Sequence, residues 1–366
     1  MKITHVEPML IGLPYEHGAP KPALGSGAVR TLMDAVYIRV DTDEGISGWG
    51  EAFGFGACAI TLEAAKIVVA PLAVGRDPGD IPALMTDLHH RLHGMALNGP
   101  VRFALSGLDI ALWDIAGKIA GEPIHRLLGG DGARTRIPAY ASLLRTQDPS
   151  HVANISTEAA SRGYRQIKLH ERTVEEVAAA RQAVGPDVAL MLDTNCHWGT
   201  KEAVEMAKRL REYDLMWLEE PVSPPDDFDG LKRVRLEGGI AVAAGENLGT
   251  FHDLRRIIEA DAVDFVQPDV TKLGGITEIW KAVEFAAETG AKLEPHSPLY
   301  GPGLIATQHI IAAMKQDALC EYYFCDLGAS PMGDAILAKD GFMDVPTGPG
   351  LGVEVDLDVI ERYRMG

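Results

Sequence analysis

Few cysteines, a shortage of positive charge and the absence of long apolar runs each exclude a class of protein. The 366 residues include only four cysteines, which show neither metal-site spacing nor a paired framework, so we expect reduced thiols and a cytoplasmic location. A net charge of −18 argues against nucleic acid and anionic membranes as partners. No segment approaches the roughly 20 apolar residues that cross a bilayer, and the N-terminus has no apolar signal-peptide core.

A nucleotide-binding fingerprint is also missing. The glycine-rich stretch 51–58 has neither the GxGxxG spacing nor a basic residue after it. We therefore expect no phosphate cradle there, and a NAD-dependent enzyme on a doubly wound sheet is disfavoured.

The most informative stretch covers residues 188–296, where short apolar runs each end in an acid or a histidine. The runs are 188–193, 215–219, 240–246, 265–269 and 291–296. They are too short for helices and are typical of buried strands. Helix-like stretches at 202–213 and 278–289 lie between them, so the pattern predicts a parallel sheet.

The runs end at Asp193, Glu219, Glu246, Asp269 and His296, which are 26, 27, 23 and 27 positions apart. This is about one unit of a (β/α) barrel each time, and active sites of such barrels lie at the carboxyl ends of the strands. Three neighbouring carboxylates would repel each other unless a cation were bound, and oxygen ligands favour Mg²⁺ before Mn²⁺ or Ca²⁺. A single acid at a strand end is often only a helix cap or a loop residue. The shared register of five such residues favours a site.

Several motifs carry a resemblance to a known family. They are Leu192-Asp-Thr-Asn195, Trp217-Leu-Glu-Glu-Pro221, Gly245-Glu-Asn247, Gln267-Pro-Asp269 with Lys272-Leu-Gly-Gly275, Pro295-His296, Cys320-Glu321, and upstream the segment 104–114 with Leu127-Leu-Gly-Gly130. Over essentially its whole length the chain resembles the enolase superfamily, and within it the mandelate racemase subgroup. The resemblance implies an α/β fold: a modified (β/α)7β TIM-type barrel with an α+β N-terminal capping domain. The implied boundaries are 1–130 for the cap, 131–330 for the barrel and 331–366 for a segment that returns to the cap.

The resemblance also implies a metal site and a substrate contact. Asp193, Glu219 and Glu246 match the ligands of Mg²⁺, with Mn²⁺ as a second possibility. Asn195 faces the same way as Asp193 along the strand, and we expect it to donate to the substrate or to a metal-bound water.

Three further residues match the acid-base machinery of the family. Asp269 and His296 correspond to a dyad in which the aspartate orients the imidazole. Glu321 corresponds to the acid that hydrogen-bonds the substrate carboxylate, either protonated or strongly hydrogen-bonded. Lys272 is expected to neutralise nearby acids.

One departure from the family concerns its usual Lys-x-Lys motif, which here is Lys168-Leu-His170. Strand alternation points Lys168 and His170 to the same face. Lys168 corresponds to the lysine near the substrate carboxylate, and His170 takes the place of the catalytic lysine. The alternative for His170 is a filler of the barrel or a partner of a substrate hydroxyl.

The capping domain is expected to select the substrate. Its loop 14–30 is rich in Gly, Pro and Ala and is followed by the second glycine-rich turn at 51–58. His17, Lys21, Phe53 and Phe55 are the candidate contacts.

The implied first reaction step is removal of the proton α to a carboxylate. If water then leaves the β-carbon, the protein is an acid-sugar dehydratase giving a 2-keto-3-deoxy acid. If the proton returns to the other face, it is a racemase or epimerase of a 2-hydroxy acid or amino-acid derivative. A third alternative is a non-catalytic, metal-dependent acid-binding protein. We favour dehydration, because two imidazoles can serve as base and acid near neutral pH. The expected partners are a small-molecule carboxylate and, from the family, further copies of the chain.

Overall fold

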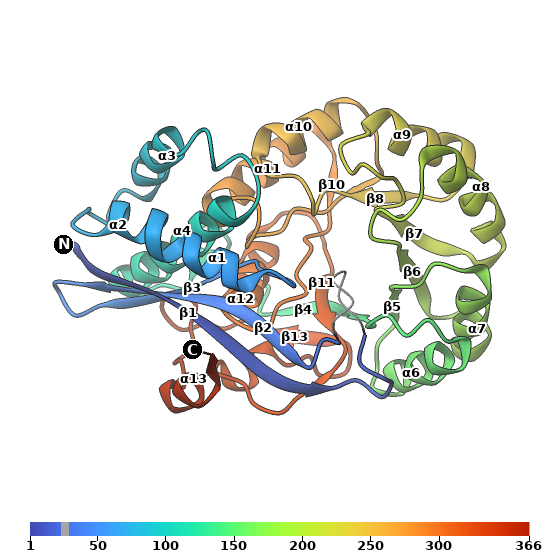
Figure 1. The fold of residues 1–366 in the computed structure, drawn as a ribbon, viewed down its shortest axis with the longest axis horizontal. Helices are drawn as coiled ribbons and strands as arrows, with labels where there is room; N and C mark the ends of the chain where they lie inside the picture. The colour runs from blue at the N-terminus through green and yellow to red at the C-terminus, as the bar shows by residue number, and fades with distance from the viewer. Residues whose placement is uncertain (23–28, 366) are drawn as a thin grey trace.

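The structure is a computed structural model that describes residues 1–22 and 29–365. Part of the predicted loop 14–30, residues 23–28, and Gly366 lie outside the described residues. Figure 1 shows an antiparallel sheet with its helices, in blue, beside a ring of green to orange helices that surrounds parallel strands. This arrangement is the predicted combination of a cap and a barrel.

The cap sheet is antiparallel, in the order β12-β1-β2-β3, with β14 also paired to β1. Its strands are β1 (Ile3–Glu16), β2 (Leu32–Thr42), β3 (Ser47–Ala52), β12 (Asp326–Leu327) and β14 (Arg364–Met365). The turn after β2 contains Gly45 at a φ of 78°, a conformation that glycine adopts without strain. β1 ends at Glu16, three residues into the predicted loop 14–30.

The cap helices follow β3 directly. They are α1 (Cys58–Ala64), η1 (Ala65–Val69), α2 (Ala70–Ala73), α3 (Ile81–Arg91), α4 (Pro100–Ala120) and α5 (Ile124–Leu127). The long helix α4 packs against β3 so closely that a Cβ at Gly50 would collide with the carbonyl oxygen of Gly107. Glycine at both positions therefore lets strand and helix touch.

The barrel strands are all parallel, in the order β10-β9-β8-β7-β6-β5-β4-β11, so the first and last strands of the barrel are neighbours. They are β4 (Arg136–Ser142), β5 (Gln166–Leu169), β6 (Ala189–Asp193), β7 (Leu215–Glu219), β8 (Val242–Ala244), β9 (Phe265–Val266), β10 (Lys292–Leu293) and β11 (Cys320–Tyr323). The predicted runs thus coincide with strands, although β8 to β10 end before the acid or histidine that closes each run.

Each pair of consecutive barrel strands is joined by a helix. Within the described residues these helices are α6 (Pro149–Ser161), α7 (Val174–Val184), α8 (Thr200–Leu210) with η2 (Arg211–Tyr213), α9 (Phe228–Arg233) with η3 (Val234–Gly238), α10 (Phe251–Glu259), α11 (Gly275–Thr289) and α12 (Pro302–Ala313). Asp148 caps α6 by accepting from the backbone N–H groups of Ser150 and His151, as expected for a helix that starts at Pro149. The (β/α)7β architecture is confirmed.

The chain after β11 contacts both the barrel and the cap. It includes η4 (Gly333–Ile336), β13 (Phe342–Asp344), which pairs antiparallel with β4, and α13 (Leu357–Tyr363). The backbone N–H of Leu351 donates to Asp114 Oδ1 of α4 at 2.8 Å. The C-terminal segment is therefore attached to the cap by a side chain as well as by β12 and β14.

Helix α4 also holds the cap on the barrel. Ser106 Oγ accepts the backbone N–H of Gly274 at 2.8 Å, and Asp109 Oδ1 accepts that of Thr277 at 3.0 Å. Trp113 Nε1 donates to Thr277 Oγ1 at 3.0 Å. Because these bonds reach the loop after β9 and the first turn of α11, they fix the cap over the carboxyl ends of the strands.

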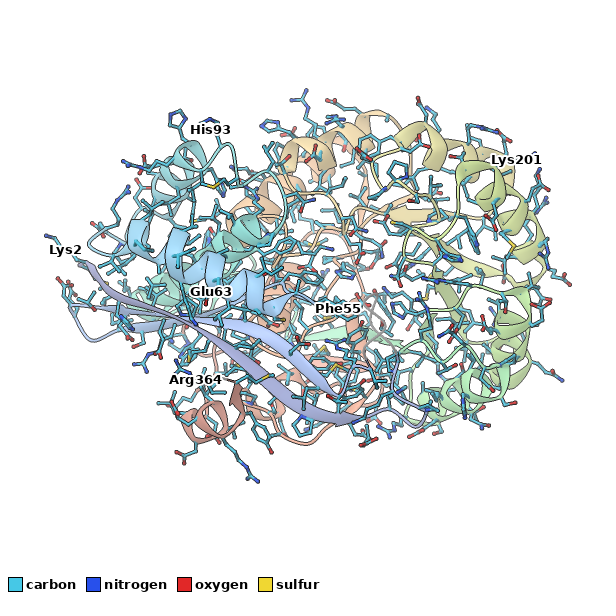
Figure 2. The ribbon with its side chains drawn as sticks, in the orientation of Figure 1. Lys2, Phe55, Glu63, His93, Lys201 and Arg364 are labelled. Carbon is cyan, nitrogen blue, oxygen red and sulfur yellow. The ribbon has the colours of Figure 1, made fainter. Side chains whose placement is uncertain are left out.

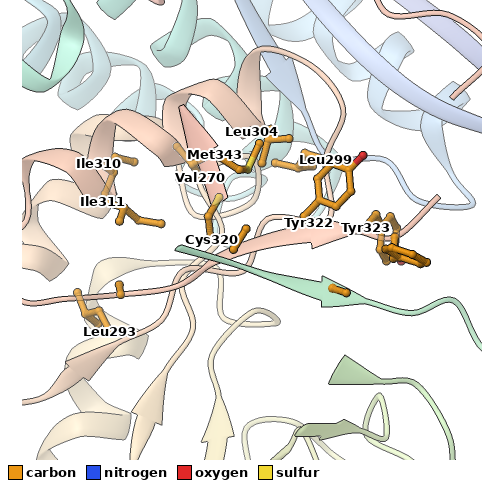
Figure 3. Close-up of a cluster of buried hydrophobic side chains, with 14 of the residues drawn as sticks. Val270, Leu293, Leu299, Leu304, Ile310, Ile311, Cys320, Tyr322, Tyr323 and Met343 are labelled. Carbon is orange, nitrogen blue, oxygen red and sulfur yellow. The ribbon is translucent and has the colours of Figure 1, made fainter. Parts of the chain in front are cut away.

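The largest apolar core lies between the barrel strands and their helices. Figure 3 shows part of it, including Leu304 and Ile310 of α12, Leu293 of β10 and Cys320 of β11. A smaller cluster of Tyr140, Met191, Trp217, Ala243 and Leu319 fills the barrel interior.

Two further predictions can be compared with the structure. All four cysteines are free thiols. Across residues 1–22 and 29–365 no helix combines the length and the apolar character needed to cross a membrane.

Candidate active site

A cavity of about 570 Å³ lies between the cap and the carboxyl ends of the barrel strands. Phe53 and Phe55 line it from the cap, and His170, Asp193 and His296 line it from the barrel. Figure 2 shows Phe55 in the middle of the molecule, between the cap and the barrel ribbons. The cavity thus contains residues from both parts, including two of the four predicted cap contacts.

Beneath the cavity lies a buried lysine surrounded by acids. Lys168 Nζ is 2.6 Å from Glu219 Oε1, 2.8 Å from Glu321 Oε1 and 3.9 Å from Asp193 Oδ2. Burial alone would lower the pKa of Lys168, but the charges of Glu219 and Glu321 raise it well above its usual value. The ammonium is therefore charged at neutral pH and neutralises acids that come from three different strands.

Glu321 of β11 is held by several donors. Its carboxylate accepts from Ser142 Oγ at 2.7 Å and from the backbone N–H of Ser297 at 3.0 Å, besides its contact with Lys168. Burial opposes its ionisation, but Lys168 outweighs this effect and lowers the pKa of Glu321 to about 2. Of the two forms that the sequence left open, the lowered pKa favours the ionised, hydrogen-bonded carboxylate.

His296 and Asp269 form a hydrogen-bonded pair at the other side of the cavity. His296 Nδ1 lies 2.6 Å from Asp269 Oδ2, while Asp269 Oδ1 accepts from the backbone N–H and the hydroxyl of Thr271 at 2.7 and 2.6 Å. His296 Nε2 contacts the Glu246 carboxylate. Although burial lowers the pKa of His296, the acids around it, Glu246 first, raise it well above its usual value. The aspartate thus fixes the orientation of the imidazole.

His170 lies just beyond β5 and also reaches the cavity. Its Nδ1 is 2.6 Å from the carbonyl oxygen of Leu143, so Nδ1 carries a proton and Nε2 remains for other partners. Nε2 lies 3.2 Å from Asp193 Oδ2. Because β5 and β10 are five places apart in the strand order, His170 and His296 approach the cavity from different sides.

Asn195 adopts a left-handed backbone conformation with a φ of 48°. Its backbone N–H and its Nδ2 both donate to the Asp193 carboxylate, at 2.8 and 2.9 Å, and its Oδ1 accepts from Arg145 at 2.8 Å. Asn195 lines the cavity, but in this structure its side chain positions Asp193.

The predicted cap contacts His17 and Lys21 are not among the residues that line the cavity. Because β1 continues to Glu16, His17 is buried against the ring of Tyr15, with centroids 5.9 Å apart. Lys21 Nζ lies 3.5 Å from both the Thr31 carbonyl oxygen and a Glu16 carboxylate oxygen. Among the described residues, the cap reaches the cavity through Pro22, Arg30 and the two phenylalanines instead.

Three arginines in the cavity wall were missed by the sequence analysis: Arg30, Arg145 and Arg172. Arg145 and Arg172 each stand three residues after the end of a strand, β4 and β5 respectively. Their place just after the carboxyl end of a barrel strand, the same rim that carries the predicted acids, is the sequence signal that could have identified them.

The cap contributes one buried acid close to the dyad. Glu51 of β3 is 1% exposed, and its Oε2 accepts the backbone N–H of Gly303 at 2.9 Å. Burial, with a further contribution from the charge of Asp269, raises the pKa of Glu51 to about 8. Glu51 is therefore mostly protonated at neutral pH.

The predicted metal ligands Asp193, Glu219 and Glu246 are all buried and follow three neighbouring strands. Within the described part of the chain, no three His, Cys, Asp or Glu side chains are already gathered as a ligand set. Glu219 is bonded to Lys168 and to Trp217 Nε1, and Glu246 contacts His296. The donor chemistry suits a hard cation such as Mg²⁺, provided that Glu219 and Glu246 exchange these partners for the ion.

Comparisons with known proteins cover nearly the whole chain. Residues 151–359 match the enolase C-terminal domain-like family, and residues 19–129 match the N-terminal domain of the mandelate racemase / muconate lactonizing enzyme family. D-galactarolactone cycloisomerase of Agrobacterium fabrum is 32% identical, covering 100% of this chain and 99% of the relative. D-xylonate dehydratase of Haloferax volcanii is 31% identical, covering 92% and 87% respectively. A racemase from Streptomyces coelicolor, solved with bound magnesium, has a TM-score of 0.85 and 26% identity, covering 99% and 100%.

Proposed function

The chain belongs to the mandelate racemase / muconate lactonizing enzyme family of the enolase superfamily, and we propose that it dehydrates a sugar acid to a 2-keto-3-deoxy acid. The observation that carries this proposal is the placement of His170 and His296 on different sides of one cavity. Two imidazoles so placed can act on neighbouring carbons: one removes the proton from the α-carbon, and the other protonates the hydroxyl on the β-carbon. The dehydratase among the similar proteins supports the same reaction class.

The first step is removal of the proton α to the substrate carboxylate by one of the two histidines. Asp269 holds His296 in position, and the carbonyl oxygen of Leu143 holds His170. As the C–H bond breaks, its electron pair moves into the carboxylate, which becomes an enediolate. The buried ammonium of Lys168, beneath the cavity, supplies positive charge that stabilises the additional negative charge.

In the second step the enediolate collapses and the β-hydroxyl leaves as water. The other histidine gives the hydroxyl its proton, so one molecule of water is lost and the carbon skeleton is unchanged. The enol that forms then tautomerises to the 2-keto-3-deoxy acid. This sequence requires one imidazole to begin neutral and the other to begin charged.

We assign Mg²⁺, or Mn²⁺ in its place, to Asp193, Glu219 and Glu246. Three buried acids from neighbouring strands and the magnesium-bound structural relative support this assignment. A divalent ion there would supply Lewis-acid stabilisation of the substrate carboxylate. Asn195 would keep Asp193 oriented through its two hydrogen bonds.

Isomerisation is the second candidate function, and the cycloisomerase among the similar proteins favours it. It shares the first step, but the proton then returns to the carbon skeleton and no atoms are lost. The same two histidines would serve a racemase or epimerase.

Proton NMR in D₂O distinguishes these functions. The protein is incubated with Mg²⁺ and a panel of aldonic, uronic-derived and aldaric acids. We expect the signals of a 2-keto-3-deoxy acid for at least one of them. Loss of an α-proton signal without a new skeleton would instead establish racemisation or epimerisation, and a rearranged skeleton of the same mass would establish cycloisomerisation. Ligand binding without any exchange would indicate a non-catalytic binding protein.

A further inference from the structure

The cavity wall carries three arginines in a chain whose net charge is −18. Arg30 comes from the cap, and Arg145 and Arg172 come from the loops after β4 and β5. We call these three residues the arginine wall. They are absent from the proposed chemistry, which uses only Lys168, the histidines and the acids.

The acids of the cavity already have positive partners. Asp193 lies near Lys168 and His170, and Glu246 contacts His296 and lies 4.0 Å from Lys272 Nζ. The acids therefore do not need the arginine wall for neutralisation.

The arginines themselves have few ion-pair partners, although the charges of Asp193, Glu171 and Glu176 act on Arg172. Among the described residues, neither Arg145 nor Arg172 has a carboxylate within 4.0 Å, and Arg30 has only Asp34, at 3.8 Å. Arg172 Nε and Arg30 Nε and Nη1 are buried without a hydrogen-bond partner in the described part of the chain. Both side chains also line the cavity, so a ligand there would be bound through their remaining guanidinium N–H groups.

Arg145 is the fixed member of the wall. Its Nε donates to the carbonyl oxygen of His170 at 2.7 Å, and its Nη2 donates to Asn195 Oδ1 at 2.8 Å. These bonds leave Nη1 as a donor. Arg145 and Arg172 also lie close enough that burial and the charge of Arg145 together lower the pKa of Arg172. Two like charges held together in a cavity wall are typical of an anion site.

We propose that the arginine wall binds a second anionic group of the substrate, at the end opposite the reacting carboxylate. The substrate class is then a dianionic sugar acid: an aldaric acid, or an aldonic acid with a terminal phosphate. Guanidinium groups suit both, because their planar donors match carboxylate and phosphate oxygens. This inference rests on the proposed function for the reacting end and adds the recognition of the far end.

The test compares acids of the same stereochemistry that differ only at the far end. An aldonic acid ends in CH₂OH, its aldaric counterpart in a carboxylate and its phosphorylated counterpart in a phosphate. We expect kcat/KM for one of the dianionic acids to exceed that for the aldonic acid by at least about tenfold, as expected for charge-assisted hydrogen bonds to a group that the aldonic acid lacks. The preferred dianion identifies the anionic group.

Variants of Arg172 tie the preference to the arginine wall. Arg172→Gln should raise KM for the preferred dianion about tenfold or more while changing KM for the aldonic acid less than about twofold. Arg172→Lys should recover part of the difference, because it restores the charge without the planar fork. The matched control is Arg255→Gln, an exposed arginine on α10 that pairs with Glu259.

Calorimetric titration of the same acids, with and without Mg²⁺, gives a readout that is independent of turnover. If no acid is turned over, the proposed function fails, and tighter binding of the dianion that is lost in Arg172→Gln would still support the second anion site. If an aldonic acid is turned over as efficiently as its dianionic counterparts, the proposed function stands and the second anion site is overturned. Equal binding of the aldonic and dianionic acids also overturns the second anion site. Equal losses for all acids in Arg172→Gln would likewise overturn it, because they would indicate a general structural role.

Discussion

Lys168 Nζ lies 2.6 Å from Glu219 Oε1, and neither side chain has any exposed surface. Two opposite charges thus meet in a barrel interior that excludes water. Breaking such a pair leaves an ion without solvent or a partner, which is far more costly than breaking an exposed pair.

We therefore expect Lys168→Met to lower the free energy of unfolding by roughly 3 to 5 kcal/mol, the usual cost of leaving buried charges unpaired. Chemical denaturation at neutral pH measures this change. Lys201→Met, at an exposed site on the outer end of the barrel (Figure 2), serves as the control and should change stability by less than about 0.5 kcal/mol. A Lys168 variant as stable as this control would show that the acids are neutralised in another way.

Removal of divalent cations should abolish turnover. Mg²⁺ added to the chelator-treated protein should restore activity and raise Tm, because an ion that binds the folded state stabilises it. Glu219→Gln should abolish turnover and reduce the Tm shift, which a thermal melt with increasing Mg²⁺ measures. Full activity in excess chelator, or an unchanged shift in Glu219→Gln, would remove Glu219 from the ligand set.

Asp269→Asn should lower kcat on the order of 100-fold or more, because His296 loses the carboxylate that fixes its orientation. Substrate binding should change much less, so the loss should lie in kcat and not in KM. Asp317→Asn, an exposed change near β11, is the control for the charge. A full-rate Asp269 variant would contradict the dyad.

His170→Asn distinguishes the roles of the two histidines. If His296 removes the α-proton, this variant should still exchange that proton with D₂O but form product at least about 100-fold more slowly. NMR measures exchange and product in the same sample. Activity within about tenfold of the parent would show that His170 is not an essential acid or base, since a tenfold change is only about 1.4 kcal/mol in the barrier.

Glu51→Gln should change how stability depends on pH. The pKa of Glu51 is about 8 in the folded protein and near 4.5 in the unfolded chain, so folding takes up a proton between these values. The stability that Glu51 contributes is fully present below about pH 4.5 and is lost as the pH rises through 8, by at most about 1.4 kcal/mol per pH unit. The variant should therefore gain stability relative to the parent from about pH 5 to 8. Urea denaturation across this range measures the difference, with the exposed Glu63→Gln as control. If the free energy of unfolding depends on pH in the same way for Glu51→Gln and the parent, the raised pKa is contradicted.

The strand-end residues could be predicted from the sequence because a parallel barrel converts regular spacing into a shared rim. Asp193 and Glu219 are in fact register partners on β6 and β7. Their hydrogen-bond partners could not be predicted in this way. The contacts of Glu219 with Lys168 and of Glu246 with His296 depend on side-chain rotamers, which spacing does not specify.

The cap contacts were harder to predict because loop residues follow no period. Because β1 continues to Glu16, the side chain of His17 is buried against Tyr15 and does not line the cavity. Arg145 and Arg172 were not predicted for a different reason. They belong to separate loops, and both line the same cavity only once the strands are aligned in the barrel.

The strand pairing of β1 with β14 has a consequence for biosynthesis. β1 is made first, but two of its neighbours, β12 and β14, are made last, and β4 likewise waits for β11. Figure 1 accordingly shows the N and C labels on the same side of the molecule. A ribosome must therefore release almost the entire chain before either sheet can gain all its strands, and the emerging polypeptide carries unpaired strand edges that a chaperone could shield.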